Sequence, residues 1–289
     1  MAVPFKIEEV SRNVHVVRFN LKKSTNSQWF LLSSDRHHDN AHTDQSLERK
    51  HLVQAKERGA GIIDVGDQHC AMQGKWDRRA DRSALRPEYQ QGEYLDYLVK
   101  YAAEFYAPYS ENFVVIGKGN HETSIIKRHE TDLTGRTCEL MSHISGTKVH
   151  SGGYGGWVRL IAKCGNNSRR TLDMKYFHGS GGGGPVTRGV IQTNRQAVYL
   201  PDADYVVTGH THDHWVVPIA RERINRVGQV YQDEQVHVRI GTYKDEYADG
   251  HGGWHIERGG PPKPIGACWL RLWYEGRGKI LRSEITRAT

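Results

Sequence analysis

Five polar clusters in the sequence each follow directly on a short apolar run, and their order constrains the fold more than any other feature. They are Asp35-x-His37, Gly66-Asp67, Gly119-Asn120-His121-Glu122, His178 and Gly209-His210-Thr211-His212. Strand ends lie at one edge of a sheet, where several loops converge on a cleft. Three of the clusters contain a glycine, which suits a sharp exit where the backbone passes close to another group. The pattern predicts one polar site at a sheet edge.

The two halves of the chain differ in the periodicity of their apolar residues. The first half predicts strands over 29–34, 60–65 and 113–116, alternating with helices near 45–58 and 92–106. The second half predicts strands over 157–161, 174–178, 204–208, 236–240 and 269–274, with one helix near 190–199. Strands that alternate with helices favour an α/β core. We expect a single layered domain over 1–289, with a basic insertion near 71–91 and a β-rich extension after 213.

Composition limits the class of protein. The 40 basic residues against 33 acidic ones give a charge of +7, which suits an anionic partner. The four cysteines are scattered and form no CxxC pair, which argues against a disulfide scaffold or a zinc ribbon. The first residues lack a secretory layout, and no apolar run is long enough to span a bilayer. We therefore expect a soluble cytoplasmic protein without a membrane partner.

Each polar cluster taken alone has an ordinary explanation. An isolated Asp-x-His is commonly a polar loop, Gly-Asp is commonly a turn, and Asn before His at a loop start can cap a helix. His-x-His points more directly to a metal, because alternate residues of an extended segment share a face. The chain also contains 17 histidines, and histidine is the commonest metal ligand among side chains. All five clusters in order favour a metal site.

This ordered series resembles the motifs of the calcineurin-like metallophosphoesterase family, over the stretch from Asp35 to His212. The resemblance implies a four-layer α/β/β/α sandwich with two mixed sheets flanked by helices. It also implies two divalent metal ions, drawn from manganese, iron, zinc, nickel and magnesium. Two ions about 3.5–4 Å apart can clamp the attacking and leaving oxygens of a phosphoryl displacement.

The resemblance implies a role for each residue of the series. One metal would be held by Asp35, His37, Asp67 and His212. The second would be held by Asp67, Asn120, His178 and His210, so that Asp67 bridges the two ions. A metal-bound hydroxide would attack phosphorus, and His121 would bind neither ion and act as general acid toward the leaving group.

The chain departs from the family after Asp67. The run Gly66-Asp67-Gln68-His69-Cys70 lacks both a further acidic residue and the Asp-Arg-Gly continuation of the protein Ser/Thr phosphatases. Protein phosphatase activity is therefore disfavoured. Cys70 is either a buried small hydrophobe or a ligating or oxidisable thiol. His38, His69 and His214 flank the motifs, and we leave them out of the metal set because both sites are already filled.

Three segments are candidates for contact with substrate. The glycine-rich loop after His178 includes Gly181 and Gly182 and leads to Arg188. It is either a loop whose backbone N–H groups bind phosphate, with Arg188 facing substrate, or a flexible hairpin with Arg188 as a surface charge. The basic insertion carries Trp76 among lysines and arginines, which suits either a nucleic acid or a solvated loop. Residues 241–255 form either a binding rim or a cover for the core.

The resemblance favours a phosphodiesterase that acts on a nucleic acid or a cyclic nucleotide. Phosphomonoesterases of the family often add arginines that grip a dianionic phosphate, and no arginine follows the Gly-Asp cluster here. A phosphomonoesterase acting on small esters is the alternative, and a non-catalytic scaffold is a third hypothesis. The complete set of ligands argues against a scaffold, whereas the native metals, the substrate and the oligomeric state are left open.

Overall fold

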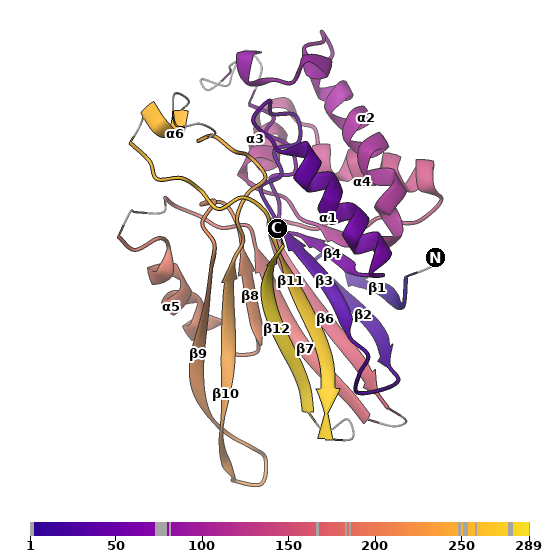
Figure 1. Cartoon of the computed structure of the whole chain (residues 1–289), viewed down its shortest axis with the longest axis vertical. Coiled ribbons are helices and arrows are strands. Elements are labelled where there is room, and N and C mark those ends of the chain that lie inside the picture. The colour runs from indigo at the N-terminus through magenta and orange to yellow at the C-terminus, as the bar shows by residue number, and fades with distance from the viewer. Residues whose placement is uncertain are drawn as a thin grey trace.

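A computed structural model describes residues 3–72, 80, 82–165, 168–182, 184, 186–247, 250, 254–257, 259–276 and 280–288. Two mixed sheets pack face to face (Figure 1). The larger sheet has the order β1 (Phe5–Ser11), β2 (Val14–Leu21), β6 (Gly155–Cys164), β7 (Ser168–Phe177), β8 (Tyr205–Thr208), β10 (Val230–Arg239) and β9 (Trp215–Ile224). The smaller sheet has the order β12 (Ile280–Ala288), β11 (Ala267–Glu275), β3 (Gln28–Ser33), β4 (Gly61–Asp64) and β5 (Phe113–Ile116).

The core between the sheets draws on both halves of the chain. Val17 and Phe19 from β2 and Leu160 from β6 meet Phe30 from β3 and Leu270 from β11 in one buried cluster. The pairs β3–β4 and β4–β5 are parallel, and so are β7–β8 and β8–β10. β3, β4 and β5 are almost wholly buried, which explains why they read as continuous apolar runs rather than as alternating ones.

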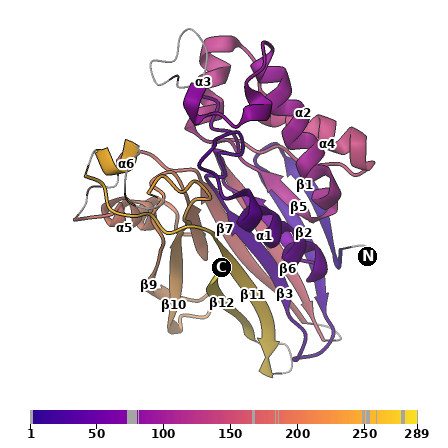
Figure 2. The ribbon, with the colours of Figure 1, turned by 45° about the horizontal axis from the view of Figure 1, so that its top comes forward.

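Most of the helices cover the outer face of the five-stranded sheet. They are α1 (Gln45–Glu57), α2 (Tyr94–Tyr106), α3 (Asn120–His129) and α4 (Leu133–Ser145), with the 3-10 turns η1 (Arg82–Ala84), η2 (Pro87–Tyr89) and η3 (Ala107–Asn112). Leu52 of α1, Ala102 of α2 and Met141 of α4 pack in one cluster with Ile62 and Phe113 of the sheet. Figure 2 shows these four helices gathered on one side of the molecule, apart from α5 (Val190–Tyr199) and α6 (Trp254–Glu257).

The outer layer on the seven-stranded sheet is thinner. Val236 and Val238 of β10 face the inter-sheet core, so Gln235 points to the opposite, outer face. There the Gln235 amide donates to the carbonyl of Leu200, the residue that ends α5, at 2.7 Å. The mixed sheets and helices agree with the predicted α/β sandwich. In the described residues, however, α5 is the one helix longer than a turn on this side, where the resemblance implies a full layer.

Two further expectations can be compared with the described residues. No helix among them is both long and apolar enough to cross a bilayer. All four cysteines are free and buried, as expected for a chain without a disulfide scaffold. Of the predicted basic insertion, residues 73–79 and 81 lie outside the described residues. Arg86 of that segment donates to Gln45 and Glu88 of the chain itself.

Candidate metal centre

Five strands deliver the predicted ligands to one place. Asp35 and His37 follow β3, Asp67 follows β4 and Asn120 follows β5, while His178 follows β7 and the pair His210 and His212 follows β8. Within each sheet these strands run parallel, so their carboxyl ends share one edge. The convergence of polar side chains that the sequence predicts is therefore present.

The first group consists of Asp35, His37 and His212. Nε2 of His212 lies 3.2 Å from Oδ1 of Asp35 and 3.2 Å from Nε2 of His37. Nε2 of His37 lies 3.8 Å from the same carboxylate oxygen. Asp35 is fully buried, and its Oδ1 accepts no hydrogen bond from the part of the chain that the structure describes. A cation between these three atoms would satisfy the buried carboxylate.

The second group consists of Asp67, His178 and His210, with Asn120 beside them. Nε2 of His178 lies 3.1 Å from Oδ2 of Asp67 and 3.1 Å from Oδ1 of Asn120, which also lies 2.7 Å from Nδ1 of His210. The other nitrogen of His178, Nδ1, lies 3.2 Å from the carbonyl of Val65. Donation to that carbonyl leaves the Nε2 lone pair facing Asp67, a common arrangement for metal-ligating histidines.

The electrostatics of the site favour a cation at its centre. Burial acts to lower the pKa of His178, but the Asp67 carboxylate raises it to about 9. Burial acts to raise the pKa of Asp67, and His178 and His121 hold it well below its usual value. The Asp67 carboxylate therefore stays ionised and attracts a positive charge, either a protonated histidine or a metal ion. Burial lowers the pKa of His37 and of His210, which leaves both neutral, as metal ligands must be.

The backbone at the site is strained at five of the predicted ligands. Eight non-glycine residues in the described chain have a positive φ, and five of them are Asp35, His37, Asp67, His210 and His212, with φ between 45° and 73°. Such a conformation costs about 1–3 kcal/mol for each residue and persists where the surroundings impose it. A concentration of this kind in one place indicates a functional site.

Glycines allow the loops to approach one another closely, as their positions in the motifs predict. A Cβ on Gly119 would lie 1.9 Å from Oδ1 of Asp67. A Cβ on Gly209 would lie 1.9 Å from Oγ of Ser34 and 2.4 Å from Oδ2 of Asp35. Gly66, with φ of +117°, passes against the backbone of the loop after β5. A side chain at any of these three positions would displace either a predicted ligand or the backbone of a neighbouring loop.

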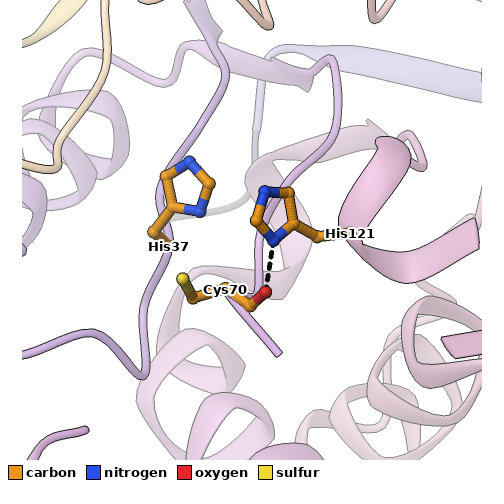
Figure 3. Close-up of side chains that lie close together, drawn as sticks. All are labelled: His37, Cys70 and His121. Atoms are coloured by element: carbon orange, nitrogen blue, oxygen red, sulfur yellow. Dashed lines mark hydrogen bonds between the residues drawn. The ribbon is translucent and has the colours of Figure 1, made fainter. Parts of the chain in front are cut away.

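His121 lies beside the two groups and is oriented by the backbone. Its main-chain N–H donates to Oδ1 of Asp67 at 3.0 Å. Its Nδ1 contacts the carbonyl oxygen of Cys70, as Figure 3 shows, while Nε2 lies 3.7 Å from Oδ2 of Asp67. Donation from Nδ1 to that carbonyl directs Nε2 toward the centre of the site.

The Cys70 side chain is nearly inaccessible. The residue is 3% exposed, and its sulfur accepts a hydrogen bond from the Asn40 amide at 3.4 Å. Burial raises the pKa of the Cys70 thiol to about 12. A thiol with so high a pKa is protonated at neutral pH, which disfavours nucleophilic attack. The Cys70 sulfur does lie within 4.8 Å of a ring nitrogen of His37 and of His121. In Figure 3 the sulfur lies on the side facing His37. Of the alternatives that the sequence leaves open for Cys70, its burial and its hydrogen bond with Asn40 favour a small buried hydrophobe.

Sequence reasoning missed Glu122, which ties the loop after β4 to the loop after β5. Its carboxylate accepts hydrogen bonds from the backbone N–H groups of Gly119, His69 and Asp67 at 2.8, 2.9 and 3.2 Å. Burial and the nearby Asp67 charge raise the pKa of Glu122 to about 7. The available signal was its position three residues after Gly119, where a helix start favours Glu.

A buried cation behind the ligands was also missed. Arg36 lies between Asp35 and His37 in the sequence and is fully buried. Its Nε donates to Asp64 at 2.6 Å and its Nη1 to Glu48 at 3.0 Å. Nη2 donates to the hydroxyl of Ser33. These bonds fix the backbone that presents Asp35 and His37. The partners lie 12 and 28 residues away in sequence, so no local pattern indicates them.

The three histidines left out of the metal set have partners elsewhere. A ring nitrogen of His38 lies 2.9 Å from Glu48, one of His69 lies 3.2 Å from the Thr137 hydroxyl, and one of His214 lies 3.1 Å from the carbonyl of Arg239. None of the three contributes to either ligand group.

The predicted substrate contacts lie outside the buried centre. Arg188, Gly181 and Gly182 are exposed, and the space around both glycines is open. The rim after β10 packs inward instead, because the hydroxyl of Thr242 and the N–H of Tyr243 both donate to the carbonyl of Asp35. The start of that rim therefore supports the ligand loop.

Comparisons with known proteins give only distant structural likeness. No protein-family model and no curated sequence matches the chain. Among solved structures, a Thermotoga maritima protein is 14% identical with a TM-score of 0.34, covering 90% of this chain and 99% of its own. An uncharacterised protein of Streptococcus pneumoniae, a predicted phosphoesterase, is 10% identical with a TM-score of 0.32, covering 91% and 99%. GAP50, the anchor in the inner membrane complex of Plasmodium, is 11% identical with a TM-score of 0.41, covering 91% and 85%.

Proposed function

We propose that the protein is a phosphoesterase that depends on two divalent metal ions and hydrolyses phosphodiesters. The observation that carries the proposal is the pair of adjoining ligand groups, Asp35 with His37 and His212, and Asp67 with His178 and His210. Mixed carboxylate and imidazole donors suit zinc, manganese, iron and nickel, and the carboxylates also suit magnesium. In this proposal Asn120 completes the second group and Asp67 bridges the ions.

Divalent ions bound at such a site lower the pKa of water and neutralise charge on the phosphoryl oxygens. The protein supplies the rigid frame and a proton donor. His121 is the donor in this proposal, because the Cys70 carbonyl holds Nδ1 and leaves Nε2 directed at the centre. A protonated Nε2 can then deliver its proton to the departing alkoxide.

The absence of an arginine directly after the Gly-Asp cluster favours a diester over a monoester. A dianionic phosphate is usually gripped by arginine, which binds it through two parallel hydrogen bonds. Of the two buried arginines of the described residues, Arg36 is occupied by the protein, whereas Nε of Arg239 has no hydrogen-bond partner among them. Arg36 donates to Asp64, Glu48 and Ser33, and Arg239 donates to the carbonyl of Gly209 at 2.7 Å while covering the Trp215 ring.

The substrate class is proposed from the surface and the glycine loop. A charge of +7 suits a polyanion or a nucleotide. Gly181 and Gly182 are exposed in open space, so their backbone N–H groups are accessible to a phosphate, and Arg188 follows on the same loop. We therefore propose a nucleic acid or a cyclic nucleotide as substrate.

The test is a panel of substrates with protein that has been chelated and then reconstituted with Mn²⁺. The panel compares bis-p-nitrophenyl phosphate, p-nitrophenyl phosphate, cyclic nucleotides, and single- and double-stranded DNA. We expect higher kcat/KM on the diesters. A preference for p-nitrophenyl phosphate would contradict the phosphodiesterase and support the phosphomonoesterase. If protein that carries two ions hydrolyses none of the substrates, the scaffold hypothesis is supported instead.

A further inference from the structure

A histidine occupies a core position at the start of β2, outside the loops that carry the candidate metal centre. His15 shares the inward face of β2 with Val17, Phe19 and Leu21, which belong to the core between the sheets. It is fully buried, and neither of its ring nitrogens has a hydrogen-bond partner among the described residues. Buried polar groups are nearly always paired, so an imidazole left in this state indicates a missing partner.

Two further ligand-type side chains surround His15. Glu9 of β1 is its direct partner across the β1–β2 pair. His150, from the segment between α4 and β6, places its ring edge-on to His15 with centroids 5.3 Å apart. Nδ1 of His150 lies 3.2 Å from Oε2 of Glu9. One ligand atom from each of the three side chains lies within 4.8 Å of the others.

We propose that Glu9, His15 and His150 bind a single Zn²⁺ ion, separate from the candidate metal centre. Two imidazoles and one carboxylate are a zinc donor set, and water completes a tetrahedron. Bond lengths of about 2.0–2.2 Å place neighbouring ligand atoms roughly 3.4 Å apart. The His150–Glu9 distance of 3.2 Å is close to this value, and an inward rotation of the His15 ring would supply the third ligand.

The protonation state of the site fits metal binding. Burial lowers the pKa of His15 to about 4, and burial also lowers the pKa of His150, so both rings are neutral at pH 7 and offer a lone pair. Lys148 is the competitor, because its Nζ lies 2.7 Å from the same Glu9 oxygen. The Lys148 side chain is 71% exposed, so it can move into solvent when an ion binds.

The ion would act as a clamp rather than as a reaction centre. It would join the edge strand β1 to the segment that contains His150, whose carbonyl accepts a hydrogen bond from Ile116 at the end of β5. β5 leads directly into the loop that carries Asn120. Zinc at this site therefore braces the support of the candidate metal centre without belonging to it.

The test compares Zn²⁺ bound per chain, measured by equilibrium dialysis and metal analysis after chelation. Glu9→Gln removes a ligand with little change of shape at a partly exposed position, and His143→Ala removes an exposed histidine of α4 as the matched control. We expect Glu9→Gln to bind one equivalent fewer than the wild type, and His143→Ala to match the wild type. Lys148→Met should bind that equivalent several-fold more tightly.

A second measurement follows the ring nitrogens of His15 by NMR, which should shift on addition of Zn²⁺ to the wild type and stay unchanged in Glu9→Gln. Equal zinc stoichiometry in the wild type and Glu9→Gln would overturn the proposal, as would an equal loss in His143→Ala. The difference between variants does not depend on how many ions the other centre holds, so failure of the proposed function would leave this test intact.

Discussion

Two contacts position His121. Its main-chain N–H donates to Asp67, and Nδ1 of its ring contacts the carbonyl oxygen of Cys70. Replacement by alanine removes the side chain without touching a ligand of either group. We expect His121→Ala to retain its metals and to lose about 10²–10⁴ in kcat/KM on substrates with alkoxide leaving groups. Nitrophenolate needs less protonation, so its loss should be smaller.

The measurement pairs metal content with kcat/KM on both kinds of substrate. His129→Ala, at the other end of the same helix, is the control and should behave as the wild type. Loss of a metal from His121→Ala would make the residue a ligand. Equal slowing on both substrates with the metals retained would make it an electrostatic donor to the phosphoryl oxygens.

Asp67 offers the sharpest test of the bridging role at the scale of one residue. Asp67→Asn keeps the shape of the side chain and removes its charge. The two proposed ions would then lose the carboxylate that bridges them. We expect metal content to fall from about two equivalents to below one and activity to be almost abolished. Asp96→Asn, at an exposed position of α2, is the control. Full activity with two ions bound in Asp67→Asn would contradict the bridge.

The loop between β5 and α3 carries a prediction at the scale of an element. The Cβ of Gly119→Ala would meet Oδ1 of Asp67 at 1.9 Å and its backbone N at 2.6 Å, so the loop or the ligand must move. We expect loss of metal and activity, with a decrease of about 1–3 kcal/mol in the free energy of unfolding. In Gly92→Ala the added Cβ meets nothing within 4 Å, and both properties should be retained. Metal content, activity and urea unfolding of the two variants decide the matter.

The elements best predicted from sequence are those buried on both faces. β3, β4 and β5 read as apolar runs because sheet and helices cover them, and their predicted limits lie within one residue of those observed. β1, β2, β9 and β12 were not predicted, since their exposed residues interrupt the apolar pattern. α3 was missed because its first turn, Asn120 to Glu122, coincides with a motif that reads as a loop.

The site divides in a similar way. The motifs indicate which residues converge, and the structure brings all seven predicted ligands and His121 together. Their binding of metal stays a prediction. Arg36 and Glu122 were beyond reach because their roles depend on partners that only the fold supplies, such as Asp64 and the N–H of His69. Residues that ligate can be read locally, whereas residues that hold the ligands in place cannot.

For the whole molecule, buried histidines predict a loss of stability in acid. Burial lowers the pKa of each of four such residues to about 4, namely His15, His51, His69 and His237. In the unfolded chain these histidines have a pKa of about 6.5, so they bind protons more readily there than in the folded protein. The stabilising contribution is complete above pH 6.5 and is lost as the pH falls toward 4.

His51 isolates this effect, because it lies in α1 and contacts the Tyr243 hydroxyl at 2.8 Å rather than a predicted ligand. We expect the wild type to lose about 2 kcal/mol more than His51→Gln between pH 7 and pH 5. Urea unfolding of chelated protein at the two pH values measures the difference. An identical pH dependence in both proteins would show that His51 titrates normally in the fold.

The left-handed backbone at Asp35, His37, Asp67, His210 and His212 sets a trade-off between activity and stability. Glycine adopts this conformation without steric cost, so glycine at the partly exposed His212 would relieve roughly 1 kcal/mol of backbone strain. On the proposed function, a substitution that stabilises such a position is therefore an inactivating one. Selection or design for thermal stability alone would dismantle the centre first, and a screen for stabilised variants has to include activity from the start.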